Sequence, residues 1–224
     1  MTSTLELKNI SIGFGQRTLV RGIQATIVAG ELVGIKGRNG CGKTTLLKTV
    51  AGLQRPLNGS IVIDGKNLTE LDARSRAKNM SMVLTQRQVP AGLDVLTLVS
   101  MGRFPHASAF GWVSKNARET AELWMDRLSI SHFAATSLSN LSDGELQKVM
   151  IARALAQESK FVLLDEPTAY LDYVARVDIV QLLQTVAHDH GVGIVFSSHE
   201  IELMSAHSDR VLEMSDGKMQ EIAP

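Results

Sequence analysis

The chain has 224 residues, and its 23 basic residues (Lys and Arg) balance its 23 acidic ones, so the formal net charge is zero. The length suits one domain, or one domain with a sizeable insertion, and the balanced charge argues against a nucleic-acid-binding protein with a global basic excess. A single cysteine, Cys41, excludes an internal disulfide framework and a cysteine-based zinc cluster. The first ten residues lack a signal-peptide pattern, and no run approaches about 18 uninterrupted apolar residues. We therefore expect neither secretion nor a membrane helix.

The N-terminal part of the chain predicts short strands and one strand–loop–helix unit, an order typical of phosphate-binding units. The strand candidates are apolar or alternating runs at residues 5–12, 19–28, 31–35, 61–63 and 82–84. A break at 13–16 separates the first two runs. A glycine-rich turn at 37–42 follows the third strand and leads into a helix. Four apolar residues are expected on one side of that helix: Leu46, Leu47, Val50 and Leu53.

The middle of the chain, from about residue 88 to 157, changes to helical spacing. The apolar positions that mark one helix face recur every three or four residues: Ala117, Ala121, Trp124 and Leu128. After residue 160 short apolar strands return, at 161–164 and 193–196, with a helix between them at 174–188 and a final hairpin around 216–218. The pattern predicts a parallel-sheet α/β domain interrupted by a helical insertion.

The glycine-rich turn carries the first motif, because residues 37–44 fit G-x-x-x-x-G-K-[ST]. Glycines let successive backbone N–H groups point into one anion-sized nest, and the following helix adds its positive end. Lys43 would reach the β- and γ-phosphates, and the Thr44 hydroxyl would bind Mg²⁺. The nucleotide contacts are assigned to Gly37, Arg38, Asn39, Gly40, Cys41, Gly42, Lys43, Thr44 and Thr45. Cys41 is either a small residue tolerated in the loop or a thiol whose pKa the helix lowers.

A second motif ends the strand predicted at 161–164, where Asp165 and Glu166 follow four apolar residues. Adjacent strand residues point to opposite faces, so the two carboxylates cannot share one role. Asp165 suits the surroundings of Mg²⁺, and Glu166 suits a general base that acts on water. Together with the phosphate loop, this pair predicts a nucleoside triphosphatase.

Residues 141–145, Leu-Ser-Asp-Gly-Glu, resemble the LSGGQ signature of ATP-binding-cassette (ABC) ATPases. Four further positions match the same family in order: Phe14, Gln86, Asp172 and His199. The resemblance, which runs from about residue 4 to 220, implies that Phe14 stacks on adenine and that Asp172 belongs to the D-loop near the nucleotide. It also implies that Gln86 senses Mg²⁺, and that Gln86 and His199 act with Glu166 in hydrolysis. The implied ligands are ATP and Mg²⁺.

The resemblance implies a P-loop NTPase (RecA-like) core, an N-terminal antiparallel β-subdomain and an inserted α-helical subdomain. The core with its β-subdomain would comprise residues 1–87 and 158–224, and the helical subdomain with the signature would comprise 88–157. Two cassettes of this family face each other head-to-tail, and Ser142 and Gly144 of one would contact the γ-phosphate held by the other. Asp143 and Glu145 depart from LSGGQ, and we expect both side chains to point away from the phosphate.

The same family implies a role in transport. Residues 99–106, VSMGRFPH, resemble those of bacterial importer ATPases for iron-siderophore complexes, haem and cobalamin. The implied partners are membrane permease subunits, a second ATP-binding subunit and, indirectly, a substrate-binding protein, with no nucleic acid. The implied location is the cytoplasmic face of the membrane, as a peripheral subunit. Alternatives are an ABC ATPase of another transporter type, a soluble ABC protein of translation or DNA repair, and a small-molecule P-loop kinase.

Overall fold

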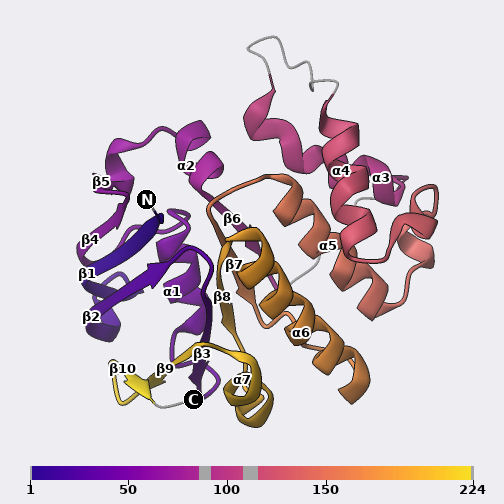
Figure 1. Ribbon diagram of the computed structural model, residues 1–224. Helices are drawn as coiled ribbons and strands as arrows, with labels where there is room; N and C mark the ends of the chain where they lie inside the picture. Colours follow the sequence, from indigo (N-terminus) through magenta and orange to yellow (C-terminus); the bar gives the residue numbers. More distant parts are fainter. Residues whose placement is uncertain (1, 86–91, 108–115, 223–224) are drawn as a thin grey trace.

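The computed structural model describes residues 2–85, 92–107 and 116–222, and it arranges them as two β-sheets with helices between and beside them (Figure 1). This confirms the predicted fold class, a mixed α/β core with an N-terminal β-subdomain and a helical part. The predicted Gln86 lies outside the described residues.

The larger sheet has six strands in the order β10-β9-β3-β8-β7-β6. Its strands are β3 (Leu32–Gly37), β6 (Met80–Val83), β7 (Phe161–Asp165), β8 (Gly193–Ser197), β9 (Arg210–Ser215) and β10 (Lys218–Ile222). All neighbours pair in parallel except β9 and β10, which form the predicted C-terminal hairpin. β7 and β8 are buried along their whole length, as expected for parallel strands covered on both faces.

The smaller sheet is antiparallel, with the strand order β2-β1-β4-β5. Its strands are β1 (Thr4–Phe14), β2 (Arg17–Val28), β4 (Asn58–Ile63) and β5 (Lys66–Asn67). The predicted break at 13–16 is too long, because β1 continues through Gly13 and Phe14. A Cβ atom at Gly13 would lie 2.0 Å from the Arg17 carbonyl oxygen, so a glycine is needed for the hairpin to close.

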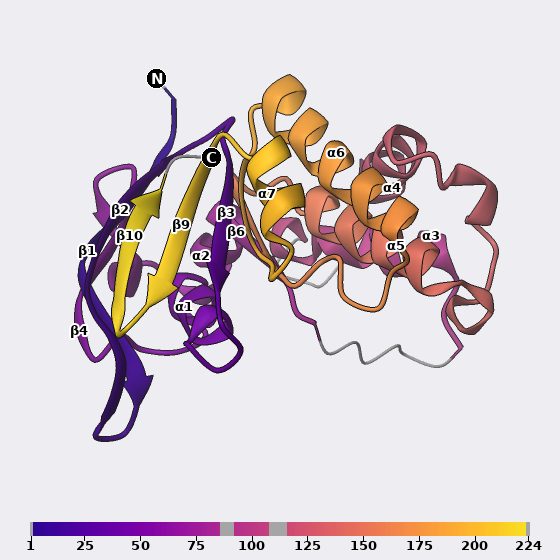
Figure 2. The ribbon, with the colours of Figure 1, turned by 90° about the horizontal axis from the view of Figure 1, so that it is seen from below.

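Helices fill the space between the sheets and cover the outer face of the larger one (Figure 2). α1 (Lys43–Val50) contacts β1 on one side and β3 and β7 on the other, whereas α6 (Tyr173–His190) and α7 (Ile201–His207) cover the opposite face of β3. α1 buries Leu46, Leu47 and Val50, but it ends before Leu53, which is 67% exposed. The prediction that Leu53 shares the buried face is therefore wrong, because the helix stops before its spacing could place it there.

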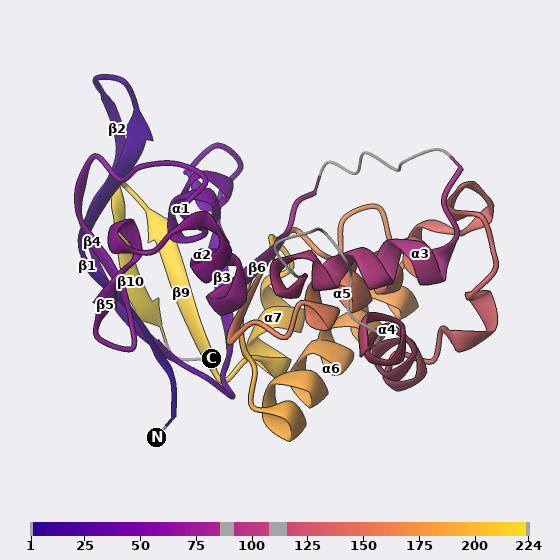
Figure 3. The same ribbon diagram turned by 90° about the horizontal axis from the view of Figure 1, so that it is seen from above.

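The remaining helices form a separate group beside the β6 edge of the larger sheet (Figure 3). Its helices are α3 (Val95–Ser100), α4 (Asn116–Arg127) and α5 (Asp143–Ala156), with 3₁₀ turns at η2 (Met101–His106), η3 (Ser131–Phe133) and η4 (Leu138–Asn140). The predicted helix face is confirmed, because all four of its residues are buried: Ala117, Ala121, Trp124 and Leu128. The link from β5 to β6 contains η1 (Leu68–Glu70) and α2 (Ala73–Asn79). No helix in the described part of the chain combines the length and the apolar content needed to span a membrane.

Candidate nucleotide site

Three neighbouring parallel strands, β3, β8 and β7, end at the same edge of the larger sheet and bring the two predicted motifs together. Ile35 of β3 pairs with Ser197 of β8, and Ser197 pairs in turn with Asp165 of β7. The phosphate loop leaves β3 at this edge, and Glu166 follows β7 there. Ligands of open α/β sheets bind outside the carboxyl ends of such strands.

The phosphate loop curls back over the end of β3 before α1 begins at Lys43. Gly40 and Gly42 have φ angles of 79° and 111°, a backbone region that residues other than glycine rarely adopt. The first turn of α1 holds no acidic residue, so its N–H groups face the site without a competing carboxylate of their own helix. Lys43 is 7% exposed, and its Nζ donates a 2.8 Å hydrogen bond to the Gly37 carbonyl oxygen. The ammonium group is thereby held above the loop.

The buried carboxylate of Asp165, 4% exposed, accepts hydrogen bonds from hydroxyl groups of three separate segments. Thr44 Oγ1 lies 2.8 and 3.0 Å from its two oxygens, and Ser197 Oγ donates to Oδ1 at 2.9 Å. Thr85 Oγ1, just after β6, lies 2.9 Å from Oδ2. Thr44 and Asp165 are therefore neighbours, as the sequence predicts for two metal-associated groups. Thr85 and Ser197 were not singled out, because a lone hydroxyl in a sequence carries no signal.

The donor set around Asp165 fits a magnesium ion that keeps most of its coordination for water and nucleotide phosphates. Mg²⁺ in such sites is bound through one or two carboxylates together with substrate phosphates, without an all-protein cage. Asp165 supplies the carboxylate and Thr44 the hydroxyl. Among the residues that the structure describes, no group of three or more His, Cys, Asp or Glu side chains could hold a metal ion by itself.

Glu166 turns away from Asp165 and faces Lys43 and His199. Its φ angle of 50° takes the chain out of the strand, and its backbone N–H donates to Ser197 Oγ at 2.9 Å. One carboxylate oxygen lies 3.3 Å from Lys43 Nζ, and the other lies 3.0 Å from Nδ1 of His199. The two adjacent carboxylates thus have different partners, in agreement with the separate roles expected of them.

A cavity of about 550 Å³ opens above the phosphate loop. Its lining residues are Phe14, Arg17, Leu19, Asn39, Gly40, Gly42, Lys43, Thr44, Thr45 and Glu166. Phe14 is 60% exposed at the end of β1, which leaves its ring available for stacking. Arg17, opposite Phe14 in the β-hairpin, also lines the cavity, although no motif in the sequence marks it. Cys41 is half-buried and packs with the apolar cluster beneath the loop, as a small tolerated residue would.

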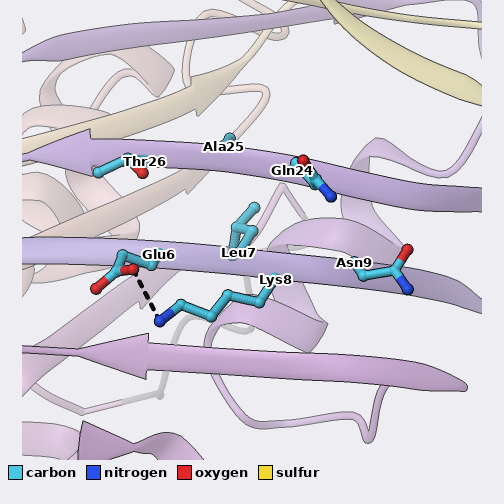
Figure 4. Close-up of a pocket in the computed structure, with 7 residues that line it drawn as sticks. All are labelled: Glu6, Leu7, Lys8, Asn9, Gln24, Ala25 and Thr26. Atoms are coloured by element: carbon cyan, nitrogen blue, oxygen red, sulfur yellow. Dashed lines mark ion pairs between the residues drawn. The ribbon is translucent and has the colours of Figure 1, made fainter. Parts of the chain in front are cut away.

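Another hollow lies on strands β1 and β2 of the smaller sheet and lacks this chemistry (Figure 4). Its charged lining residues are Glu6 and Lys8, and they form an ion pair with each other at 2.9 Å. No residue of the phosphate loop or of the ends of β7 and β8 lines it. The loop cavity is therefore the better nucleotide site.

The signature residues lie apart from that cavity, at the start of α5. Ser142 is the N-cap of α5, and its hydroxyl and backbone N–H both donate to the Glu145 carboxylate, at 2.7 and 2.8 Å. These hydrogen bonds lower the pKa of Glu145. The Glu145 side chain folds back on Ser142, so in this arrangement the serine proton points at a carboxylate of its own helix.

Gly144, in the first turn of α5, and Asp172, the N-cap of α6, lie apart from the phosphate loop. A Cβ atom at Gly144 would lie 3.8 Å from Cβ of Ala175, so the signature helix begins against the first turn of α6. Asp172 caps that turn, accepting a 2.8 Å hydrogen bond from the Ala175 backbone N–H. The predicted nucleotide contacts that do not line the loop cavity are Gly37, Arg38 and Cys41 of the loop itself, together with Ser142, Gly144 and Asp172.

Several protein families share a phosphate loop, and comparison with known proteins decides among them. The family model for ABC transporters matches residues 20–169, which is more than half of the chain. The chain belongs to the ABC transporter family. The assignment to this family excludes the small-molecule kinase considered from the sequence.

Relatives of this ABC cassette include ATP-binding proteins of iron import and transport systems. It is 33% identical over 215 residues to the iron(3+)-hydroxamate import ATP-binding protein FhuC of Bacillus subtilis, covering 96% of this chain and 80% of FhuC. It is 30% identical to the ferric enterobactin transport ATP-binding protein FepC of Escherichia coli, covering 95% of this chain and 78% of FepC.

Solved structures agree with the fold of this ABC cassette. A chain of a protein described as a metal-chelate type ABC transporter, in an inward-facing conformation, superposes with a TM-score of 0.87 and 26% identity, over 99% of this chain and 83% of that one. A dimeric bacterial ABC transporter cassette superposes with a TM-score of 0.83 and 27% identity, over 98% of this chain and 99% of that one.

Proposed function

We propose that this ABC cassette is the ATP-hydrolysing subunit of a membrane importer for iron complexes, haem or cobalamin. The observation that carries the proposal is the meeting of three groups at one sheet edge: Lys43 in the phosphate loop, Asp165 among hydroxyls, and Glu166 beside His199. The relatives support the direction and the cargo, because FhuC is an iron(3+)-hydroxamate import protein and FepC a ferric enterobactin transport protein.

In this proposal the loop binds the ATP phosphates through its backbone N–H groups and through Lys43, and Phe14 stacks on the base. Arg38, Cys41 and Thr45 contribute through their backbone N–H groups. Glu166 accepts a proton from the attacking water as general base. His199, 3.0 Å from Glu166, orients the Glu166 carboxylate or contacts the γ-phosphate.

Thr44 and Asp165 would hold Mg²⁺, with Gln86 as the residue that senses it. The ion supplies charge neutralisation on the β- and γ-phosphate oxygens when bound. The three hydroxyl donors keep the Asp165 carboxylate oriented toward Thr44. The proposed core, residues 1–87 and 158–224, contains Thr44, Gln86 and Asp165. The proposed helical subdomain, residues 88–157, contains the signature.

A second copy completes the site in the proposed mechanism. Ser142 and Gly144 stand at a helix N-terminus outside their own chain's loop cavity, so the phosphate that they would contact is one held by a partner. The Ser142 hydroxyl would exchange its bond to Glu145 for this contact. Asp172 caps the first turn of α6 by accepting from the Ala175 backbone N–H, and Ala175 lies next to Gly144. Asp172 is therefore close to the start of the signature helix. The head-to-tail homodimer would dock, as a peripheral subunit on the cytoplasmic face of the membrane, onto permease subunits that receive cargo from a binding protein.

The ATPase part of the proposal is tested by measuring hydrolysis against protein concentration. If two cassettes form each site, the rate per cassette rises with concentration and levels off once dimers dominate. The in-trans site would be contradicted if the rate per cassette stayed constant from nanomolar to micromolar protein, at concentrations where light scattering detects no dimer.

The transport part is tested with proteoliposomes that contain the cassette and the permease encoded beside it. Loading the outside with an iron-siderophore complex, haem or cobalamin, in the presence of the cognate binding protein, should give ATP-dependent uptake of one of the three. ATP-dependent release of a preloaded compound, with no uptake, would favour the alternative of another transporter type.

A further inference from the structure

His199 is held between two carboxylates, one at each ring nitrogen. Nδ1 lies 3.0 Å from Glu166 Oε2, and Nε2 lies 3.6 Å from Glu200 Oε1. The imidazole is otherwise 59% exposed, so few packing contacts limit its rotation. The two acidic groups therefore determine how the ring is oriented toward the site.

Glu200 is itself fixed by an arginine from another element. Arg176, in the first turns of α6, forms an ion pair with Glu200 Oε1 through Nη1. Its Nε donates a 2.8 Å hydrogen bond to the Leu171 carbonyl oxygen. Both side chains of the pair are half-buried, which reduces the screening that weakens exposed pairs. A planar guanidinium with two fixed partners holds a carboxylate in one place better than a flexible ammonium does.

These contacts connect two segments that are distant in the sequence. Leu171 lies directly before Asp172, the N-cap of α6, whereas His199 and Glu200 lie in the link from β8 to α7, where Glu200 is the N-cap. A continuous series of contacts runs from Leu171 to Arg176, Glu200 and His199, and then to Glu166. The segment after Glu166 is thereby linked to His199 through side chains.

We propose that Arg176 and Glu200 are positioning residues for His199. This inference depends on the proposed function, because it assumes that His199 acts in ATP hydrolysis. Glu200 accepts from, or pairs with, the ring nitrogen remote from Glu166, and Arg176 prevents Glu200 from turning into solvent. Neither residue lines the cavity above the phosphate loop, and neither does His199, which is linked to that cavity by its contact with Glu166. Among the described residues, Arg176 and Glu200 have no such contact with a lining residue of their own, so both act through His199 and not on the nucleotide. A purely structural pair would stabilise α6 without changing the state of the imidazole.

The kinetic test uses Arg176→Gln, Arg176→Lys and a control in a surface pair. Arg176→Gln should lower kcat about tenfold with the ATP affinity unchanged, because a misplaced catalytic group reduces rate more than binding. Arg176→Lys, which retains the charge, should recover part of the loss. Arg118→Gln breaks the exposed Arg118–Glu122 pair in α4 and should leave kcat unchanged.

A double-mutant comparison separates positioning from folding. In a His199→Ala background, Arg176→Gln should cause no further loss of kcat, because the group that it positions is already gone. If the two losses multiply, with equal melting temperatures for the single variants, the inference is wrong.

Ring NMR provides a readout that does not require hydrolysis. The His199 imidazole signals, assigned by their disappearance in His199→Ala, should shift in both Arg176→Gln and Glu200→Gln and stay in place in Arg118→Gln. Unchanged His199 signals in both variants would overturn the positioning role. Shifted signals in a cassette that hydrolyses no ATP would retain the positioning role and reject the proposed function.

Discussion

The phosphate-loop edge and the start of the signature helix differ in how completely one chain builds them. At the loop edge, Asp165 is buried and bonded to three hydroxyls, and Lys43 is buried between Gly37 and Glu166. At the signature, Ser142 is exposed, and its hydroxyl is bonded to Glu145 of its own helix. The side chains at the loop edge are thus already arranged around the cavity, whereas the Ser142 hydroxyl is bonded within its own helix. The difference supports the proposal that the second region becomes functional against another copy.

The largest effect is expected at the loop edge, from Glu166→Gln. An amide cannot accept the proton of water as a carboxylate does, so ATP turnover should fall by about 10²–10⁴-fold. Binding of ATP, measured by fluorescence titration, should remain, because Lys43 and the loop amides are unchanged. The exposed Glu202 of α7 offers a matched control, and Glu202→Gln should hydrolyse ATP normally. Normal turnover in Glu166→Gln would remove Glu166 as the base.

A smaller loss is expected at the signature, from Ser142→Ala. Removing one hydrogen bond to a charged phosphate should lower turnover about tenfold to a hundredfold. ATP binding to dilute, monomeric protein should not change, because Ser142 lies outside the cavity of its own chain. Ser139→Ala removes another exposed hydroxyl shortly before α5 and is expected to be silent. Weaker ATP binding by monomeric Ser142→Ala would place the serine in its own chain's site and end the contrast between the regions.

The hydroxyls around Asp165 provide an intermediate test, through Thr85→Val. Loss of one donor to Asp165 should raise the Mg²⁺ concentration needed for half-maximal nucleotide binding about threefold to tenfold. Nucleotide binding without Mg²⁺ should not change. Titrating Mg²⁺ against a fluorescent ATP analogue measures this directly. Thr85→Ser keeps the hydroxyl and should behave like the parent chain. Equal Mg²⁺ dependence in Thr85→Val and Thr85→Ser would show that the Thr85 bond does not tune the metal site.

The smallest effect is expected from Glu145, whose role is to cap α5. Glu145→Ala should cost about 1 kcal/mol of unfolding free energy at neutral pH, measured by urea denaturation, because the capping box is lost. The pKa of Glu145 lies below its usual value of 4.5 in the folded chain. The contribution of its charge is therefore present above about pH 4.5 and is lost as the pH falls through the lowered pKa. A stability difference that grew with acidification would contradict the Ser142–Glu145 bonds as its source.

Much of the architecture could be predicted from local patterns, for a physical reason in each case. The glycine spacing of 37–44 and the apolar run before Asp165 each have a chemistry that is determined within a few residues. The buried face of α4 follows from the helical repeat alone. Leu53 shows the limit of such patterns, because periodicity does not say where a helix ends.

The contacts between distant segments could not be predicted. Thr85 and Ser197 meet Asp165 only because β6, β7 and β8 are neighbours in the sheet, and no local spacing encodes that neighbourhood. Arg176 and Glu200 likewise meet through the docking of α6 beside the end of β8.

By itself, the sequence determined the chemistry: a phosphate loop, two carboxylates with separate roles, and a signature that resembles one family. The tertiary structure decided which hydroxyls orient Asp165, which carboxylates face His199, and that Ser142 lies outside its own chain's cavity. Motifs are local because backbone geometry is local, whereas the partner of a side chain depends on how strands and helices far apart in the chain pack together.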